Sequence, residues 1–335
     1  ESLDSASWTP HDSVSNVWST DIGESCAYLA RDGQRVYRYN DLGGLLAGLG
    51  DDDVPMDEGF FVAPDGSTLY VRSQTSPSSH QWRVPRLDYG LLVDGRDWIW
   101  IEGFEIRFYG QTDNAAGIYL RNANHTVVRE NEIHGLRRGI SVRWTGEENR
   151  GNDTRIEDNE IFDPPVDAWP WDAVKGTSME GSAIIVAGHR GAIVRRNHIH
   201  NFFNGIYTGR WGELENTGIA FDVDVYDNNV HHIGDDGFEP EGACINNRFR
   251  NNVFEDGFSG ISLAPITVGP TWVIRNRFST YWAKSFKWGN DSDGVVYVYH
   301  NTSWTDFAES NGMSIGQATH NVVMRNNIFR ATRYA

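Results

Sequence analysis

The sequence predicts an all-β protein whose main body is a parallel β-helix, a solenoid of short stacked strands. Two motifs recur together from about Leu91 onward, and both fit coils of the same length. The composition agrees, because 35 glycines and 13 tryptophans, with few leucines, favour strands and turns over helices.

The first motif is an apolar residue, two variable residues, asparagine, one variable residue and a second apolar residue. It reads "VRENEI" at Val128–Ile133 and "VYDNNV" at Val225–Val230. Its asparagines fall at positions 131, 159, 197, 228, 251, 276, 301 and 326, and the last four intervals are 23, 25, 25 and 25 residues. A fixed period in the twenties indicates a solenoid. Because coils stack about 4.8 Å apart, we expect these asparagines to form a ladder of amide hydrogen bonds.

The second motif is a small residue followed by an apolar, an outward and another apolar residue. It occurs as "GIYL" at Gly117, "GISV" at Gly139, "GIYT" at Gly205, "GFEP" at Gly237, "GISL" at Gly260, "SFKW" at Ser285 and "GMSI" at Gly312. Side chains of a strand alternate between its two faces, so the third residue points outward. The stacked outward row reads Tyr119, Ser141, Ile185, Tyr207, Glu239, Ser262, Lys287 and Ser314. A parallel row two residues further on contains Arg121, Arg143 and Glu241.

The repeat divides the chain into two regions. Residues 1–90 lack the repeat, and we interpret them as an N-terminal cap with strands that lead into the solenoid of residues 91–335. Within the cap, "RYNDLGGLLAGLG" predicts a short helix with Asn40 or Asp41 at its N-cap, and "STLYVRS" predicts a leading strand. Insertions at 163–181 and 209–218 leave the solenoid beside the outward row, where long loops typically build a binding site.

The charge of the chain limits the class of partner. A formal net charge of -17 argues against a nucleic-acid or anionic-membrane binder, since both need a basic face. No apolar run is long enough to span a membrane. We expect Cys26 and Cys244 to be two separate buried thiols. Glu1 is not a natural start, so we expect a mature secreted protein, extracellular or periplasmic.

The stretch "IGDDGFEPEG" (Ile233–Gly242) carries the strongest functional signal, four carboxylates within seven residues: Asp235, Asp236, Glu239 and Glu241. We expect the two aspartates in a turn and the two glutamates on one face of the following strand, with Cα atoms roughly 6.6–6.8 Å apart. These residues can be the acid and base of a glycoside hydrolase, ligands of Ca²⁺, or a solvated acidic turn. Their position between tryptophan-bearing loops favours a site.

Several side chains near this cluster are candidates for holding sugars. Aromatic faces stack on sugar rings, and cations bind their polar groups. The candidates are Tyr207, Arg210, Trp211, Lys287, Trp169, Trp171 and Arg143. By contrast, we expect His231 and His232, which follow a ladder asparagine, to be structural.

Residues 91–335 resemble the pectin-lyase-like superfamily of right-handed parallel β-helices, on the asparagine ladder and the period near 25. The resemblance implies a right-handed coil and a polysaccharide or oligosaccharide partner. The stretch "DGFEPEG" is also similar to the groove strand of the alginate lyase and chondroitinase B group. That similarity implies Glu239, Glu241 and Asn204 as ligands of Ca²⁺.

The catalytic lysine and arginine of that group have no counterparts in this chain. The chain has "GACINN" after Glu241 and Ala264–Pro265 one coil later. We therefore favour a glycoside hydrolase that needs no cofactor, with Asp236 and either Glu239 or Glu241 as acid and base. The alternatives are a Ca²⁺-assisted lyase or epimerase acting on a uronate polymer, and a non-catalytic glycan-binding or tailspike-like module.

Overall fold

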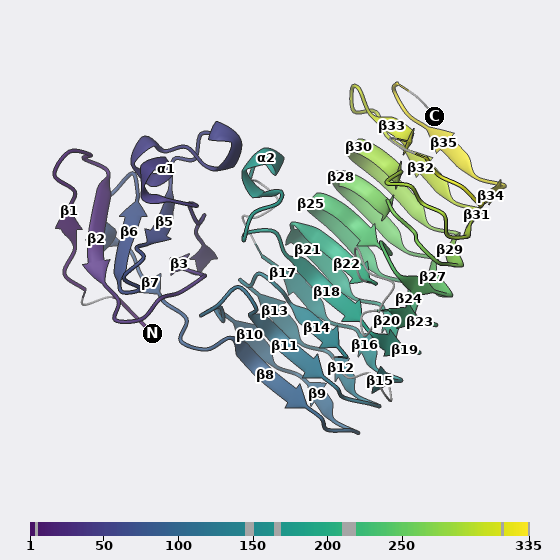
Figure 1. The fold of residues 1–335 in the computed structure, drawn as a ribbon, viewed down its shortest axis with the longest axis horizontal. Helices are drawn as coiled ribbons and strands as arrows, with labels where there is room; N and C mark the ends of the chain where they lie inside the picture. Colours follow the sequence, from purple (N-terminus) through teal and green to yellow (C-terminus); the bar gives the residue numbers. More distant parts are fainter. Residues whose placement is uncertain (4–5, 145–150, 164–168, 210–218, 316–317, 334–335) are drawn as a thin grey trace.

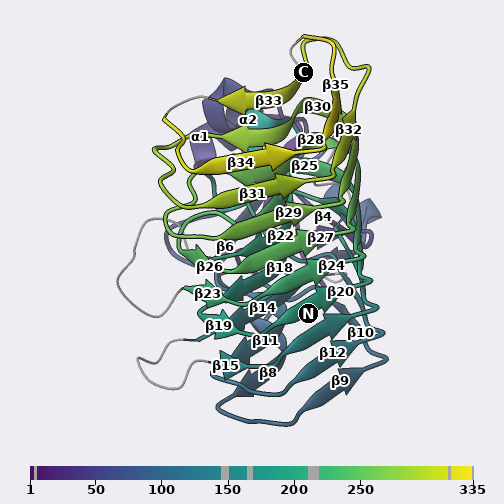
Figure 2. The ribbon, with the colours of Figure 1, turned by 90° about the vertical axis from the view of Figure 1, so that its right-hand side faces the viewer.

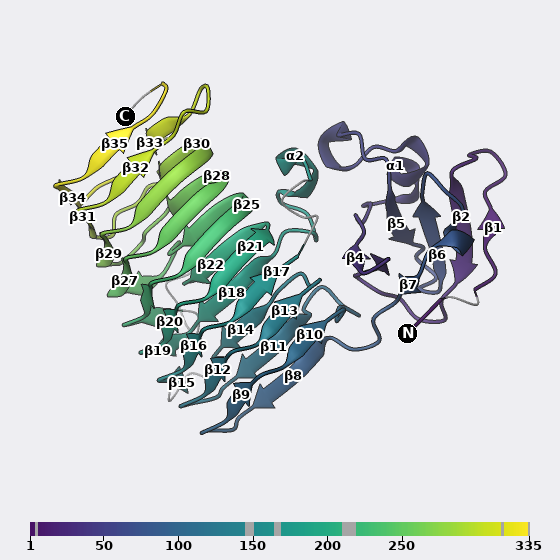
Figure 3. The same ribbon diagram turned by 180° about the vertical axis from the view of Figure 1, so that it is seen from behind.

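The computed structural model describes residues 1–3, 6–144, 151–163, 169–209, 219–315 and 318–333. These residues form a long solenoid and a smaller N-terminal unit beside it, with helix α2 (Trp171–Val174) between the two (Figures 1 and 3). The coils of the solenoid stack in chain order from β8 and β9 at one end to β34 and β35 at the other (Figure 2).

Three parallel sheets form the walls of the solenoid, as the repeat predicted. The largest contains β8 (Tyr89–Asp94), β10 (Glu105–Arg107), β11 (Ala116–Arg121), β13 (Glu132–His134), β14 (Ile140–Arg143), β17 (Glu160–Phe162), β18 (Ser182–Ala187), β21 (His198–Phe202), β22 (Asn204–Thr208), β25 (Asn229–Glu239), β28 (Val253–Leu263), β30 (Arg277–Trp288), β32 (Thr302–Trp304), β33 (Asn311–Ile315) and β35 (Ile328–Arg330).

The second sheet contains β9 (Trp100–Glu102), β12 (Val127–Arg129), β16 (Arg155–Glu157), β20 (Ile193–Arg195), β24 (Asp224–Tyr226), β27 (Asn247–Arg250), β29 (Thr271–Ile274), β31 (Val296–Tyr299) and β34 (Val322–Arg325). The third contains β15 (Gly151–Asn152), β19 (His189–Arg190), β23 (Ala220–Phe221) and β26 (Cys244–Ile245). Inward-facing Ile, Val, Leu and Phe side chains from successive coils fill one continuous core. The outward row is confirmed by the register, in which Tyr207 pairs with Glu239 and Ser262 with Lys287.

The long strand β25 of the large sheet pairs with two shorter strands of the preceding coil. Its first half pairs with β21 and its second half with β22, and the register shifts at a bulge between Ile233 and Asp236. A bulge of this kind redirects side chains and bends the strand. The expectation that Asp235 and Asp236 lie in a turn is therefore wrong, because both aspartates lie within β25.

The asparagine ladder forms, with two corrections to its members. Each ladder Nδ2 donates to the Oδ1 of the next member at 2.9–3.1 Å. Its members are Asn131, Asn159, Asn197, Asn228, Asn252, Asn276, Asn301 and Asn327. Asn251 and Asn326 are each one residue too early. They occupy the left-handed position, at φ 54° and 56°, that precedes the ladder residue in each coil.

The N-terminal unit consists of two small antiparallel sheets and a helix. One sheet contains β1 (Thr9–Pro10), β2 (Val17–Asp21), β5 (Gly59–Val62) and β6 (Thr68–Arg72), and the other β3 (Ala30–Arg31), β4 (Gln34–Arg35) and β7 (Trp82–Arg83). The unit also holds the 3₁₀ turns η1 (Asp51–Asp53) and η2 (Pro77–Ser79).

Helix α1 (Leu42–Ala47) is confirmed, with Asp41 as N-cap: its Oδ1 accepts from Gly44 N–H at 2.8 Å. The stretch "STLYVRS" forms β6 inside the antiparallel sheet instead of leading into the solenoid, which begins at β8.

The N-terminal unit packs on the side of the solenoid through the 163–181 insertion. Tyr37 Oη donates to the carbonyl of Ala173 at 2.8 Å, and Arg35 lies 2.9 Å from Asp163 in a buried ion pair. Trp98 and Trp100 of the first coils are exposed, and the role of this unit as a cap stays a prediction.

Two further expectations can be compared with the structure. Cys26 and Cys244 are both buried and unpaired, as predicted. Among the described residues, no helix is sufficiently long and apolar to cross a membrane.

Candidate functional site

A cavity of about 520 Å³ lies on the outward row where the 163–181 insertion meets the solenoid. Its charged lining consists of Glu180, Glu239, Glu241, Arg137, Arg138, Arg143, Lys175 and Lys287. Asn204 and Tyr207 lie on the lining of the coil that precedes the two glutamates. Acidic and basic side chains therefore both line the cavity, around strand β25 and the residues that continue it to Glu241.

Glu239 is buried at the cavity wall, and among the described residues no hydrogen bond to its carboxylate is found. Burial raises the pKa of Glu239 well above its usual value, and the neighbouring Glu241 and Asp236 raise it further. A buried carboxyl with a raised pKa keeps its proton near neutral pH. Glu239 can therefore donate a proton to a group bound in the cavity.

Glu241 lies in the same wall but has partners for its charge. Its Oε1 accepts a hydrogen bond from Ser262 Oγ, and Lys287 Nζ lies 3.7 Å away. Burial raises the pKa of Glu241, while Lys287 and Ser262 act in the opposite direction. Of the two glutamates, Glu241 is the one whose surroundings stabilise the anion.

Asp236 lies behind this wall and is fully buried. Lys287 Nζ donates to its Oδ2 at 2.9 Å, and its Oδ1 is buried without a hydrogen-bond partner. Burial, reinforced by Asp235, raises the pKa of Asp236 to about 7 despite Lys287. Asp236 can therefore bind or release a proton near neutral pH, although it does not line the cavity.

Asp235 is held by the 163–181 insertion. Trp171 Nε1 donates to its Oδ1 at 2.9 Å, and Lys175 Nζ donates to its Oδ2 at 2.7 Å. Lys175 also pairs with Glu180 at 3.1 Å. Burial alone would lower the pKa of Lys175, but Asp235 and Glu180 outweigh it and raise the pKa. These contacts fix the insertion against β25 and keep Asp235 away from the cavity.

The carboxylates do not fit the calcium site that the sequence resemblance implied. The oxygens that converge, within 4.8 Å of one another, belong to Asp235, Asp236 and Glu239. Glu241 is bonded to Ser262, and Asn204 Oδ1 accepts from the Asp236 amide at 3.2 Å. Ca²⁺ takes six to eight oxygen ligands, whereas two ammonium groups already neutralise this cluster.

Three arginines, Arg137, Arg138 and Arg143, also line the cavity. Arg137 is bound to the carbonyls of Glu180 and Asp113, at 2.7 and 2.5 Å. Burial, together with the charges of Arg137 and Arg143, lowers the pKa of Arg138 to about 10. Clustered cations that lower one another's pKa are stabilised by an anion placed among them.

Of the side chains expected to hold sugar, some line the cavity and others pack elsewhere. Trp169 contacts Tyr37 edge-on, with ring centroids 5.6 Å apart, and lies 5.3 Å from the Arg35 guanidinium, so it packs against the N-terminal unit. Trp171 stacks on Phe258 at 5.4 Å as it binds Asp235. Neither lines the cavity, whereas Tyr207, Arg143 and Lys287 do. Arg210 and Trp211 lie outside the described residues.

Sequence reasoning missed four charged residues of the cavity lining, Arg137, Arg138, Lys175 and Glu180. The two arginines directly precede "GISV", and their position at the start of a groove strand was a usable signal. Lys175 and Glu180 lie in an insertion without a repeat, so no periodicity could place them over β25.

Comparison with known proteins identifies the family. The sequence model described as "Right handed beta helix region" matches residues 89–278, and the chain belongs to this family. The resemblance to pectin-lyase-like right-handed β-helices is thereby confirmed. No curated protein sequence matches the chain.

Three solved structures are similar in fold. XylC in complex with xylose has a TM-score of 0.62 at 14% identity, over 98% of this chain and 64% of XylC. The alginate lyase from Paenibacillus sp. str. FPU-7 has a TM-score of 0.51 at 14% identity, over 64% of this chain and 72% of the lyase. A tailspike of E. coli bacteriophage HK620 in complex with a pentasaccharide has a TM-score of 0.55 at 11% identity, over 73% of this chain and 45% of the tailspike. This chain thus spans less than two thirds of XylC, and at such identities the likeness shows the fold alone.

Proposed function

We propose that this protein is a glycoside hydrolase that cleaves an acidic polysaccharide or oligosaccharide in the cavity beside Glu239. The observation that carries the proposal is the pair Glu239 and Glu241 in one cavity wall. Glu239 has no hydrogen-bond partner among the described residues, and Glu241 is stabilised by Lys287 and Ser262. Two carboxyl groups held in different protonation states are what glycoside hydrolysis needs. The solved relatives support a saccharide ligand, since they bind xylose or a pentasaccharide, or are an alginate lyase.

In this mechanism Glu239 is the general acid. Its buried carboxyl donates the proton to the oxygen of the leaving sugar, which lowers the barrier to breaking the glycosidic bond. Glu241 is the second carboxylate and either activates water or attacks the anomeric carbon. Lys287 favours the anionic form of Glu241, and Asp236 holds Lys287 in place from behind. No cofactor takes part in these steps.

The arginine side of the cavity selects the substrate. Arg137, Arg138 and Arg143 form a local basic surface in a chain with a net charge of -17. Guanidinium groups bind carboxylates in a fork geometry, so the sugar at this position carries a carboxylate or sulfate. A polymer of this kind does not cross a membrane unaided, and we therefore infer action outside the cytoplasm, extracellular or periplasmic.

A lyase is the second candidate, and Tyr207 favours it. Tyr207 lies directly beneath Glu239 in the register and faces the same cavity as Arg143. The arginines would neutralise a uronate carboxylate while Tyr207, as its phenolate, removes the proton on C5. The C4–O bond then breaks as the C4–C5 double bond forms, and Glu239 protonates the leaving oxygen. A Ca²⁺-assisted version predicts loss of activity with a chelator, and an epimerase predicts a changed sugar without chain cleavage.

One experiment separates these functions. Purified protein is incubated with a panel of neutral and acidic polysaccharides, and both reducing ends and ultraviolet absorbance are followed. Hydrolysis yields reducing ends without a new absorbing double bond, and the product is lost in Glu239→Gln. An absorbing product identifies a lyase, and binding without product from any polymer identifies a glycan-binding module; either result overturns the proposal.

A further inference from the structure

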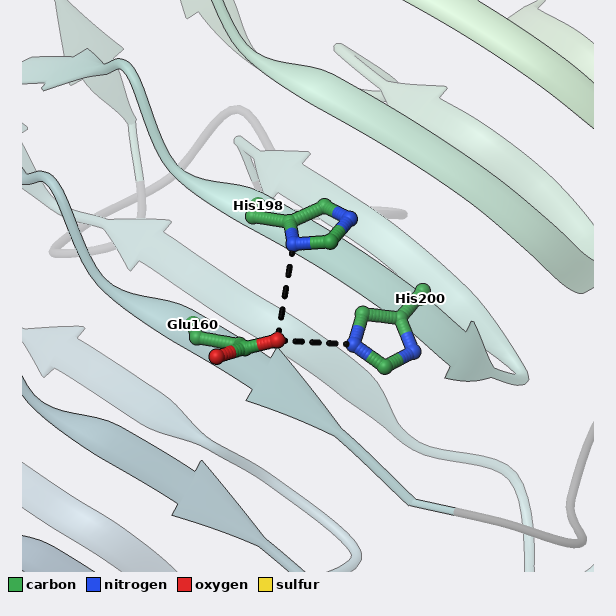
Figure 4. A group of neighbouring side chains, drawn as sticks. All are labelled: Glu160, His198 and His200. Carbon is green, nitrogen blue, oxygen red and sulfur yellow. Dashed lines mark hydrogen bonds and ion pairs between the residues drawn. The ribbon is translucent and has the colours of Figure 1, made fainter.

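A histidine cluster lies on the outer surface of the large sheet, on a different part of β25 from the cavity. Glu160 of β17 pairs in register with His198 of β21, and His200 of β21 pairs with His231 of β25. Alternation along β21 places His198 and His200 on one face. Figure 4 shows one oxygen of Glu160 facing a ring nitrogen of each of these two histidines.

The distances among these three groups match a metal site. Glu160 Oε1 lies 3.5 Å from His198 Nδ1 and 3.4 Å from His200 Nε2. The three ligand atoms all lie within 4.8 Å of one another. Tetrahedral Zn²⁺ with bonds of 2.0–2.1 Å separates its ligand atoms by about 3.3–3.4 Å. The two distances to Glu160 are close to this separation, and the two ring nitrogens lie within 4.8 Å of each other.

The tautomer of His198 is fixed by a chain of hydrogen bonds. His198 Nε2 lies 2.8 Å from His231 Nε2, and His231 Nδ1 lies 2.6 Å from His232 Nδ1. The chain ends where His232 Nε2 lies 3.1 Å from Asp256 Oδ2. Asp256 can only accept, so with neutral rings every proton in the chain points toward it. His198 then donates through Nε2, and its Nδ1 presents a lone pair to Glu160.

Contacts of His200 with its neighbours fix both its tautomer and the orientation of its ring. Its Nδ1 lies 2.7 Å from Asn201 Oδ1, which accepts the ring proton and leaves a lone pair on Nε2. Its ring is stacked between Phe162 and His231, at centroid distances of 4.9 and 5.2 Å. These contacts resemble the outer hydrogen bonds that fix the tautomer of metal-bound histidine.

With neutral rings in these tautomers, Glu160 Oε1, His198 Nδ1 and His200 Nε2 are three electron-pair donors that converge. A protonated His200 ring would instead donate to Glu160 across the 3.4 Å contact, so the metal replaces that proton. We propose that Glu160, His198 and His200 form a binding site for a divalent transition metal, with Zn²⁺ as the ion that fits best. Imidazole and carboxylate ligands suit zinc, and exposure to solvent leaves a fourth position for water. Glu160 precedes the 163–181 insertion and the histidines follow it, so the ion ties together the two coils that flank the insertion.

The test is zinc binding by the full chain, measured by titration calorimetry and by the rise in Tm. We expect one Zn²⁺ per chain at this site, and Co²⁺ in its place gives the visible spectrum of a four-coordinate site. His232→Ala, which breaks the chain to Asp256, weakens binding by about 10- to 100-fold. His200→Ala and Glu160→Gln weaken it further, since each removes a ligand.

Two controls make the result decisive. His320→Ala removes an exposed histidine that pairs with Asp293 far along the chain and leaves zinc affinity unchanged. Asp236→Asn tests the other convergent acidic cluster. Zinc that binds equally well to His200→Ala, or that is lost only in Asp236→Asn, overturns the proposal, as does the absence of binding to the wild type. Circular dichroism verifies that each variant is folded.

Discussion

Lys287 Nζ lies 2.9 Å from Asp236 Oδ2, although the two residues belong to coils that are not adjacent. The side chain of Lys287 passes Ser262 on the intervening coil and reaches Glu241 at 3.7 Å as well. The Lys287 ammonium therefore interacts with two carboxylates, Asp236 and Glu241. It favours the anionic form of both, next to Glu239 in the cavity wall.

Lys287→Met is expected to shift the acidic limb of the pH–rate profile to higher pH, by about one pH unit or more. Lys287 lowers the pKa of both Asp236 and Glu241, so its removal lets the two values rise. The anionic form of Glu241 is then reached only at higher pH. The measurement is kcat/KM against pH. Lys284→Met, in the same strand but with no ion pair to any described residue, should leave that limb nearly in place.

Glu239→Gln is expected to lower kcat by at least about 100-fold, because the general acid is lost. The same change should raise Tm at pH 8. The folded-state pKa of Glu239 is raised, so the stability that its proton contributes is present below about pH 4.3 and is lost as pH rises. The Tm difference between variant and wild type should therefore grow from about pH 4.3 upward. Glu255→Gln, an exposed glutamate, is the control, and an equal Tm effect there would contradict the argument.

Arg138→Met is expected to raise KM for an acidic polymer while kcat changes little, because Arg138 binds substrate away from the scissile bond. The variant should also show a weaker dependence of KM on salt. Arg129→Met removes a partly exposed arginine of the second sheet, far from the cavity lining, and serves as the control. A fall in kcat with unchanged KM would place Arg138 in the chemistry instead.

Asn252→Asp is expected to destabilise the fold by at least about 3 kcal/mol, because a carboxylate replaces a buried amide. The Nδ2 of Asn252 donates to Val225 O and Asn276 Oδ1, and an acid would face both oxygens without a proton. Asn251→Asp makes the same chemical change one residue earlier, on an exposed side chain, and should change stability by less than about 0.5 kcal/mol. Denaturant unfolding of the two variants checks the corrected ladder; equal effects would refute it.

Asp163→Asn is expected to cost about 3–5 kcal/mol, because Arg35 is left as a buried charge without its anion. Unfolding of the N-terminal unit, followed by tryptophan fluorescence, should register the loss. The exposed pair Arg196 and Asp158 offers the contrast, and Arg196→Met should cost no more than about 1 kcal/mol. A smaller effect at Asp163 than at Arg196 would show that the buried pair does not anchor the unit.

Much of the solenoid could be predicted from local pattern. A period near 25 and the alternation of faces fixed which residues point outward, so Tyr207, Glu239, Ser262 and Lys287 were placed in one row. The error at Asn251 and Asn326 arose where two asparagines are adjacent, since either satisfies the motif. Only the register shows that the second one faces the ladder.

The site itself was only partly predictable. The sequence identified the acidic strand, and burial, which depends on the whole fold, decided which acids reach the cavity. Asp235 and Asp236 were assigned to a turn, but a bulge in β25 and contacts from Trp171 and Lys175 bury them. Trp169 lies against Tyr37 for the same reason, because the N-terminal unit covers it.

The sequence by itself thus determined the coil, its ladder and the row that holds Glu239, because these follow from spacing along the chain. The tertiary structure decided which groups share a charge or a proton. Lys287 with Asp236 and Arg35 with Asp163 each join residues whose separation in sequence carries no signal. Their contacts arise because stacked coils and a folded-back insertion bring distant side chains within a few ångströms, where burial strengthens the interaction of charges.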